Sequence, residues 1–153
     1  MKKRRVVITG LGVVSPVGND VNDSWSNIVN GVSGIALIEN INTDDQAVKI
    51  GGAIKNLDIS QYLSPKEAKK MDIFIHYGMA AGIQAFEDSG IEVTESNADR
   101  IGVAIGAGIG GLTTIEKTAD LFREKGPRRI SPFFVPSSII NMVSGNLSIK
   151  YGL

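Results

Sequence analysis

The sequence predicts an α/β protein, and three features indicate this class. Val6 to Ile8 is a continuous β-branched run that ends near a glycine, which is typical of a strand buried on both faces of a parallel sheet. Ile101 to Gly111, IGVAIGAGIGG, is a second short apolar strand that gives way to Gly and Ala. Between them, Lys66 to Ser89 has apolar residues at helical spacing. Because α/β proteins bind ligands where a strand ends in bare backbone, we expect a binding site at Ile101 to Gly111.

Length and composition are those of one globular domain. The chain has 153 residues, and 16 basic residues balance 16 acidic ones, which argues against disorder and against a nucleic-acid binder. It has no cysteine, so a disulfide, a thiolate metal site and a thiol nucleophile are excluded within these residues. The apolar run at the N-terminus is too short for a signal peptide or a membrane span. We expect a cytoplasmic protein that binds neither nucleic acid nor membrane.

The first predicted strand, Arg4 to Thr9, leads into a Gly10-x-Gly12 motif. A strand followed by this motif resembles a dinucleotide fingerprint, in which glycines allow close approach to a pyrophosphate. However, Ser15 occupies the third glycine position, and Pro16 lies where the phosphate-binding helix should already be running. A dinucleotide site also needs an acidic residue, at the end of a second strand about 20 residues after the glycines, to bind the ribose hydroxyl. The sequence has no such residue there. A nucleotide site and a plain structural turn both remain open from these residues.

The segments that follow are a short helix and an irregular region. Asp20 to Asn30 predicts a helix that ends at Gly31, with Trp25 as a packing anchor. The chain from residue 34 to residue 63 is irregular, apart from a kinked strand over Val48 to Ile54.

Lys66 to Ser89 is the clearest predicted helix. Ser64 and Glu67 form a capping box, and Gly90 supplies the stop. The apolar face comprises Met71, Ile75, Met79, Ile83 and Phe86. Three lysines, Lys66, Lys69 and Lys70, lie in the first turns, where the helix dipole disfavours cations. They form either a solvated face or a site for an acidic partner. We assign no role to His76, the only histidine.

The C-terminal part predicts two helices around a loop. Thr113 to Lys125 is expected to be helical until Gly126, and Ser137 to Ile149 resumes helical spacing. Arg128 to Pro136 is expected to be extended because two prolines disfavour helix in the residues before them. Its two adjacent phenylalanines need a pocket or a partner. We expect the chain to end in the middle of a fold.

Five segments in register resemble one family, the elongating β-ketoacyl-acyl carrier protein synthases of bacterial fatty acid synthesis. These are VVITGLGVVSPVG (6–18), KEAKKMD (66–72), FEDSGI (86–91), RIGVAIGAGIGG (100–111) and GPRRISPFFVPSSIINM (126–142). The resemblance covers essentially the whole chain. It implies a thiolase-like α/β fold, two βαβαβαββ halves stacked in five layers, in which residues 1–153 are an incomplete N-terminal domain. It also implies a cytoplasmic homodimer that needs no cofactor and no metal.

The chemistry that this resemblance implies is a decarboxylative Claisen condensation. A cysteine takes the acyl chain, malonyl carrier protein loses carbon dioxide, and the resulting carbanion attacks the thioester; the cysteine needs a lowered pKa and the oxyanion needs donors. The family's cysteine and its two histidines lie beyond the matching segments. With no cysteine, and with His76 on a different helix, we expect these 153 residues alone to be inactive.

The resemblance carries binding roles to seven residues. Ile109 matches an isoleucine that gates the acyl pocket, and Phe134 matches a phenylalanine that reaches across the dimer into the partner's pocket. Five basic residues match positions that dock acyl carrier protein: Lys66, Lys69, Lys70, Arg128 and Arg129. No catalytic residue and no metal ligand is assigned.

Other functions remain open at this point. Ile109 and Phe134 can instead belong to the core, and the basic residues can be a solvated face. A non-catalytic relative, such as a chain-length factor, would keep the fold without the cysteine. A nucleotide-dependent oxidoreductase built on Gly10-x-Gly12 is the third hypothesis.

Overall fold

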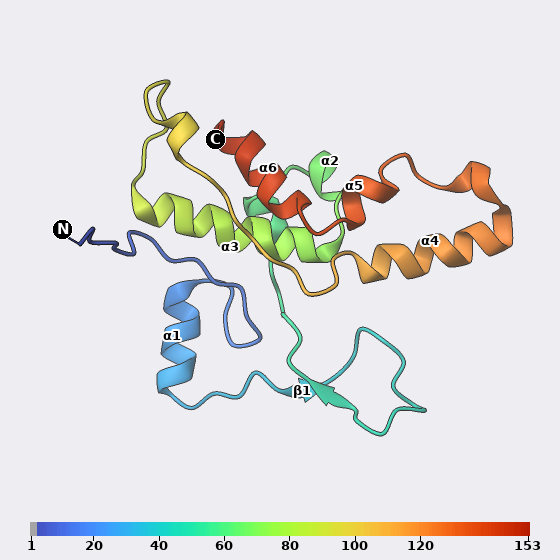
Figure 1. Cartoon of the computed structure of the whole chain (residues 1–153). Coiled ribbons are helices and arrows are strands. Elements are labelled where there is room, and N and C mark those ends of the chain that lie inside the picture. Colours follow the sequence, from blue (N-terminus) through green and yellow to red (C-terminus); the bar gives the residue numbers. More distant parts are fainter. Residues whose placement is uncertain (1–2) are drawn as a thin grey trace. The chain divides into compact units, whose positions relative to one another are not determined.

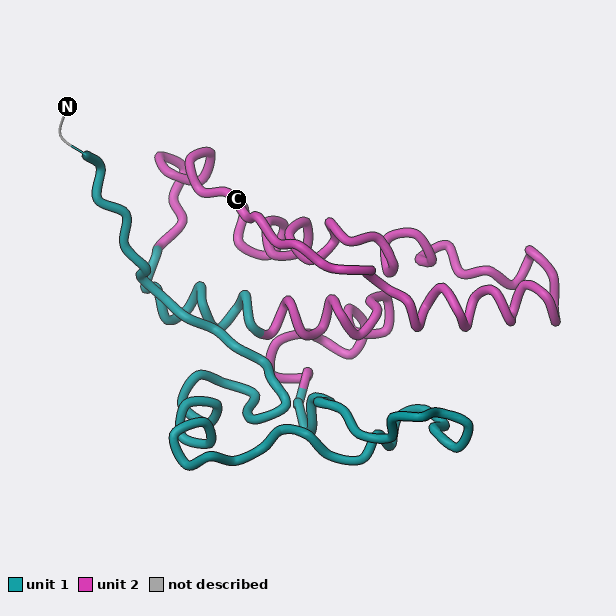
Figure 2. The backbone as a smooth tube through the Cα atoms, turned by 60° about the horizontal axis from the view of Figure 1, so that its bottom comes forward, with its two compact units in different colours: residues 1–58, 81–91 teal, residues 59–80, 92–153 magenta. Residues whose placement is uncertain are grey.

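The structure is a computed structural model that describes residues 3–153 (Figure 1). Its elements are α1 Val21–Val29, β1 Ala36–Leu37, β2 Ile50–Gly51, η1 Ile59–Gln61, α2 Pro65–Ala68, α3 Ile73–Ser89, η2 Ala98–Arg100, α4 Leu112–Lys125, η3 Pro127–Arg129, α5 Phe134–Ser138 and α6 Met142–Tyr151. The chain forms two compact units, residues 1–58 with 81–91 and residues 59–80 with 92–153, so that each contains part of α3 (Figure 2).

In the first unit, α1 confirms the predicted helix over Asp20 to Asn30. Asp20 Oδ1 accepts a hydrogen bond from Asp23 N at 2.8 Å, and Gly31 ends the helix with φ +68°. The interpretation of Trp25 as a packing anchor is wrong, since this residue is 66% exposed. Instead, α1 packs through the buried residue Ser24. The Ser24 backbone lies so close to Gly18 that a Cβ at position 18 would collide with Ser24 N.

The only sheet within residues 3–153 is the antiparallel pair of β1 and β2, in which Ala36 lies opposite Gly51 and Leu37 opposite Ile50. The strand predicted over Val48 to Ile54 is therefore paired at two residues only.

The two strands predicted at Arg4 to Thr9 and Ile101 to Gly111 are not part of a sheet. Neither segment forms a ladder with any described residue, and Val6 is 93% exposed. Exposure alternates along residues 101–108, as it does in an extended chain that contacts protein on one side. A β-branched run favours an extended backbone, but a strand also needs a neighbouring backbone to pair with, and these segments have none here.

The Gly10-x-Gly12 motif packs on α3. A Cβ at Gly10 would meet Ala85 O, and one at Gly12 would meet Ala81 O. Leu11 N donates to Asp88 Oδ2 at 2.8 Å and Val13 N donates to Gln84 Oε1 at 3.1 Å. Every second residue of the extended segment therefore meets every fourth residue of the helix. The spacings agree, because two extended residues advance about 6.6 Å and four helical residues about 6.0 Å. The helix occupies the space that a pyrophosphate would need, which supports the structural turn.

The helix predicted over Lys66 to Ser89 is two helices: α2, in the second unit, and α3, which begins in the second unit and ends in the first. The capping box is confirmed, because Glu67 N donates to Ser64 Oγ and Ser64 N donates to Glu67 Oε2. The chain then breaks after α2, and α3 starts at Ile73 and ends at Gly90, whose φ is +63°. The core of the second unit comprises Leu63, Ile75, Met79, Ala80, Val143 and Leu147.

The C-terminal part contains more helix than predicted. The helix expected over Thr113 to Lys125 is confirmed as α4. The segment expected to be extended, Arg128 to Pro136, instead contributes to η3 and α5, and the helix expected from Ser137 begins at Met142. α4 packs against η3 and α5, and α5 packs against α6. No helix in the described part of the chain is both long and apolar enough to span a membrane.

Candidate functional site

The glycine-rich segment that the sequence singled out meets α5 just before α4 begins. Gly111 N donates to Ser138 O at 2.9 Å, and Gly110 has φ +82°. A Cβ would lie 2.6 Å from Ser138 O at Gly110 and 2.7 Å from Ser138 Cα at Gly111. These two glycines are required because two backbones approach closely there. At Gly106 and Gly108, by contrast, a Cβ would have no neighbouring atom within 4 Å.

Ile109 and Phe134, the two predicted pocket residues, lie on either side of this contact. Ile109 is 68% exposed and immediately precedes Gly110. Phe134 is half-buried and is the first residue of α5. Its carbonyl oxygen accepts hydrogen bonds from the hydroxyls of Ser137 and Ser138, at 2.9 and 2.8 Å. The structure therefore brings the two segments that carry these residues together.

Asp72, which sequence reasoning missed, joins the same elements. Its side chain is buried, at 6% exposure. Oδ2 accepts from Thr114 N at 2.8 Å, Oδ1 accepts from Phe74 N at 3.3 Å, and the Asp72 amide donates to Ser137 O at 3.3 Å. The only sequence signal was its position between the lysines and the apolar helix, since its main partner is 42 residues away.

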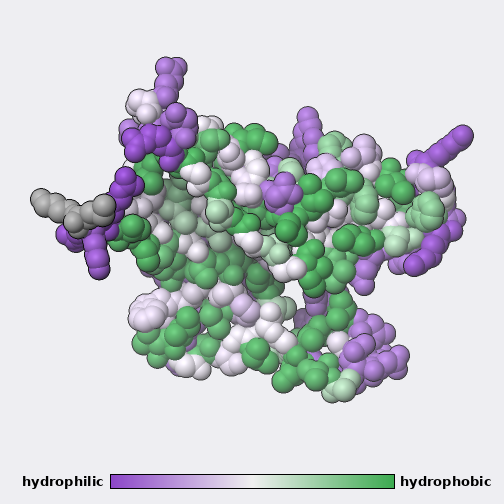
Figure 3. Space-filling view, in the orientation of Figure 1, coloured by the Kyte–Doolittle hydropathy of each residue, from purple (hydrophilic) through white to green (hydrophobic). Residues whose placement is uncertain are grey.

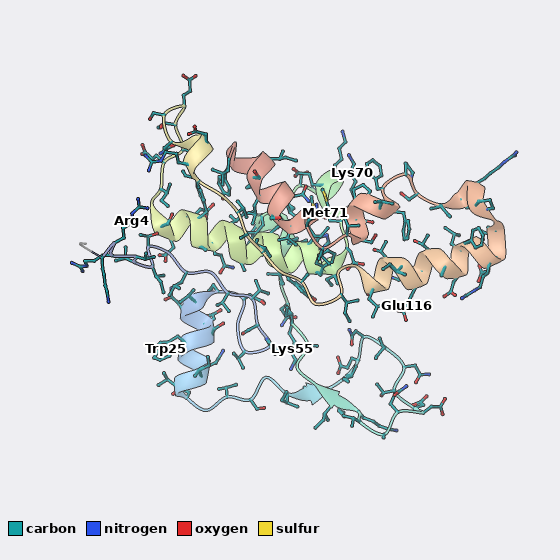
Figure 4. The ribbon with its side chains drawn as sticks, viewed as in Figure 1. Arg4, Trp25, Lys55, Lys70, Met71 and Glu116 are labelled. Atoms are coloured by element: carbon teal, nitrogen blue, oxygen red, sulfur yellow. The ribbon has the colours of Figure 1, made fainter. Side chains whose placement is uncertain are left out.

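The predicted carrier-docking lysines lie on and after α2. Lys66 and Lys69 are exposed, Lys70 is half-buried, and Lys70 Nζ lies 4.7 Å from the centre of the Phe133 ring (Figure 4). Because α2 ends at Ala68, Lys69 and Lys70 are at its C-terminal end, where the dipole favours cations. The prediction that the lysines lie in the first turns of one long helix is therefore wrong for Lys69 and Lys70, which lie between α2 and α3, whereas Lys66 lies in the first turn of α2.

The two predicted arginines lie on a different element. Arg128 and Arg129 are exposed in η3, which follows α4 and packs on it. Figure 1 shows η3 at the far end of α4 from the segment that contains Gly110. The five basic residues thus form two groups in this unit rather than one cluster.

One acidic residue lies among the lysines. Hydrogen bonds from the Ser64 side chain and backbone lower the pKa of Glu67, and the charges of Lys150 and Lys70 act in the same direction. Lys150, in the last turn of α6, is a further exposed cation near α2 that the sequence did not reveal.

Two other titratable side chains of α3, those of His76 and Tyr77, are in contact with the rest of the fold. His76 Nε2 is 2.9 Å from Ala68 O, which connects α3 to the last residue of α2. Burial raises the pKa of Tyr77. Among residues 3–153, no group of three His, Cys, Asp or Glu side chains is arranged to hold a metal ion.

Comparisons with known proteins identify similar sequences and folds. The sequence profile described as "Beta-ketoacyl synthase, N-terminal domain" matches residues 3–153. Proteins named 3-oxoacyl-[acyl-carrier-protein] synthase 2 are 59% identical in Vibrio cholerae and 50% identical in Coxiella burnetii, each over 100% of this chain. The chain spans 37% of the length of both relatives.

Solved ketosynthases have the same fold. One, a ketosynthase in complex with its type II PKS acyl-carrier protein, has a TM-score of 0.79 at 25% identity, over 98% of this chain and 39% of that one. A β-ketoacyl synthase from Burkholderia phymatum has a TM-score of 0.78 at 21% identity, over 99% of this chain and 38% of that one. The predicted thiolase-like fold class is confirmed.

Proposed function

Since the chain belongs to the β-ketoacyl synthase family, matching its N-terminal domain, we propose that the whole protein is a 3-oxoacyl-[acyl-carrier-protein] synthase. It elongates an acyl chain by decarboxylative Claisen condensation with malonyl carrier protein. The observation that carries this proposal is the 59% identity to a synthase of that name over all 153 residues. We propose that the protein acts in the cytoplasm as a homodimer and that residues 1–153 are the N-terminal part of its condensing domain.

In this proposal, the 153 residues supply binding surfaces. In this mechanism a cysteine thiolate takes the acyl chain, and these 153 residues contain no cysteine, so they cannot form that acyl-enzyme by themselves. Ile109 is an exposed apolar residue between glycines, as a movable wall of an acyl pocket requires. Phe134, held at the start of α5, reaches across the homodimer and lines the acyl pocket of the partner subunit.

The basic residues dock the carrier protein. Lys66, Lys69 and Lys70 present one positive surface, in which Lys70 lies over the Phe133 ring, and Arg128 and Arg129 present a second one. Surfaces of one charge sign steer an oppositely charged partner and raise its association rate more than its final affinity. An acidic carrier protein is the partner that this charge fits.

The test is condensation by the whole protein with acyl and malonyl groups on carrier protein. We expect a 3-oxoacyl product and release of carbon dioxide. Changing Lys66, Lys69 and Lys70 to Glu should raise KM for the carrier-bound substrates about tenfold or more, equivalent to about 1.4 kcal/mol, with kcat nearly unchanged. The effect should weaken as salt increases.

Small thioester substrates provide the control, because they carry no acidic surface. Their KM should be the same for the unmodified protein and for the charge-reversed variant. Absence of product from the unmodified protein, with carrier binding retained, would instead favour a non-catalytic chain-length factor. Equal KM values for the carrier-bound substrates before and after charge reversal would refute the docking role of the three lysines.

A further inference from the structure

Lys70 differs from the other two lysines of the proposed carrier surface. Lys66 and Lys69 are exposed, whereas Lys70 is half-buried, and its Nζ lies 4.7 Å from the centre of the Phe133 ring. A lysine ammonium within about 6 Å of an aromatic ring centre is attracted by the negative face of the ring. This contact restricts the Lys70 side chain, which would otherwise sample many rotamers in water.

The backbones that carry Lys70 and Phe133 are joined by two hydrogen bonds. The amide of Asp72 donates to Ser137 O at 3.3 Å, and Ser137 N donates to Phe133 O at 2.9 Å. On the other side, Lys70 N donates to Glu67 O at 2.9 Å, just after the end of α2. Since both backbones are held in this way, the ring and the ammonium meet in a defined place.

The ring holds the Lys70 ammonium without cancelling its charge. An aromatic ring has a negative face but no net charge, whereas a carboxylate would neutralise the ammonium. The two acidic side chains nearest to Lys70 in sequence bind other groups. Glu67 accepts hydrogen bonds from Ser64, and Asp72 accepts one from Thr114. Lys70 is therefore ordered before a partner binds, and its charge is retained.

Order of this kind favours binding in a way that charge alone does not. Immobilising a flexible side chain at an interface costs part of the binding free energy, and a side chain that is already held avoids this cost. The charges of all three lysines attract an acidic partner from a distance and so act on its association rate. The ordering of Lys70 acts only once the partner is in contact, and so on the dissociation rate.

We propose that Phe133 is a positioning residue for carrier binding, which holds the Lys70 ammonium in the orientation that an acidic carrier protein contacts. This inference rests on the proposed docking of that carrier by the lysines. The three lysines together set how fast the carrier associates, and the contact between Lys70 and Phe133 sets how long it remains bound.

The test measures the association and dissociation rates of acyl carrier protein with the whole protein by stopped-flow fluorescence. Phe133→Leu removes the ring but keeps an apolar side chain and every charge, and Phe133→Tyr keeps a ring. Trp25→Leu is the control, because Trp25 is another exposed aromatic residue and its helix, α1, contains none of the five docking residues.

In Phe133→Leu we expect the dissociation rate to rise about fivefold, the size of effect expected when one flexible side chain must be immobilised, with the association rate unchanged. Phe133→Tyr and Trp25→Leu should leave both rates near those of the unmodified protein. In a Lys70→Met background, Phe133→Leu should have no further effect, whereas in a Lys66→Met background it should keep its full effect.

An unchanged dissociation rate in Phe133→Leu would overturn the proposal. An equal effect of Phe133→Leu with and without the Lys70 charge would also overturn it, because Phe133 would then act on the carrier or on the fold without Lys70. Absence of carrier binding by the unmodified protein is a different result, and it would refute the docking function itself.

A second measurement needs no Phe133 variant, and it decides the matter if Phe133→Leu does not fold. The side-chain methylene protons of Lys70, identified in the NMR spectrum as the signals that Lys70→Met removes, lie near the face of the ring. We expect them to be shifted upfield of the corresponding protons of Lys66 and Lys69. Signals of all three lysines at the same position would show that the ring does not hold Lys70, and the proposal would fail.

Discussion

The Ser64 and Glu67 pair shows how much two neighbouring side chains can fix. Ser64 N donates to Glu67 Oε2 at 2.9 Å, and the Ser64 hydroxyl donates to the same oxygen at 2.5 Å. Both bonds favour the charged carboxylate, which is why the pKa of Glu67 is lowered. The stabilisation is present above the ordinary pKa of glutamate, about 4.3, and is lost as the pH falls through the lowered value.

We predict that Ser64→Ala raises the pKa of Glu67 toward its ordinary value, because the largest cause of the shift is removed. A carbon-13 NMR titration of the Glu67 carboxyl measures this directly. Ser144→Ala is the control, since the Ser144 hydroxyl donates to Asn141 O and not to Glu67. A titration of Glu67 that is identical with and without the Ser64 hydroxyl would contradict the assignment.

Residue-scale features were predictable where partners are close in sequence. The Ser64 and Glu67 box, three residues apart, was predicted with its partners. Asp72 was not, because nothing near it in sequence indicates that Thr114 will supply an N–H. For the same reason, the roles of Ile109 and Phe134 could be matched only through resemblance to a family.

At the scale of elements, α3 and α6 pack through a glycine. A Cβ at Gly78 would lie 3.2 Å from Val143 Cγ2 and closer still to Cγ1, and Val143 is buried. In α6, Gly145 has room, since its Cβ would meet only Met142 Sδ, at 3.9 Å. The two helical glycines therefore differ in whether they can accept a methyl group.

We predict opposite effects of alanine at these two positions. Gly78→Ala should lower the free energy of unfolding by about 1–3 kcal/mol through overpacking. Gly145→Ala should raise it by about 0.5–1 kcal/mol, because alanine is the better helix former. Urea unfolding followed by circular dichroism measures both. Adding Val143→Ala should relieve part of the Gly78→Ala cost; destabilisation that simply adds would show that the two residues do not meet.

Element prediction succeeded where an end signal is local. α1 and α4 were predicted because Asp20, Gly31 and Gly126 mark their ends. The break between α2 and α3 was missed because Asp72, which immediately precedes α3, has its main partner, Thr114, 42 residues away in the sequence. The strands at 4–9 and 101–111 were predicted from β-branched composition, but pairing depends on a neighbouring backbone that composition does not reveal.

For the whole chain, the exposed apolar side chains are the dominant feature. Scattered apolar residues are normal on a protein surface, but here a run of three, Val6 to Ile8, is exposed, and so is most of the apolar side of α1. Hydrophobic side chains are prominent on the face shown in Figure 3. Apolar surface of this kind indicates contact with further protein.

We predict that residues 1–153 alone self-associate and bind a hydrophobic dye, because association removes this apolar surface from water. Sedimentation velocity and dye fluorescence measure the two effects. Changing Val6 and Ile8 to Lys should lower both while leaving helix content unchanged, since these exposed side chains lie outside every helix. A monomeric chain that melts cooperatively and binds no dye would refute the prediction, because its apolar segments would then have to be folded onto one another rather than exposed to water.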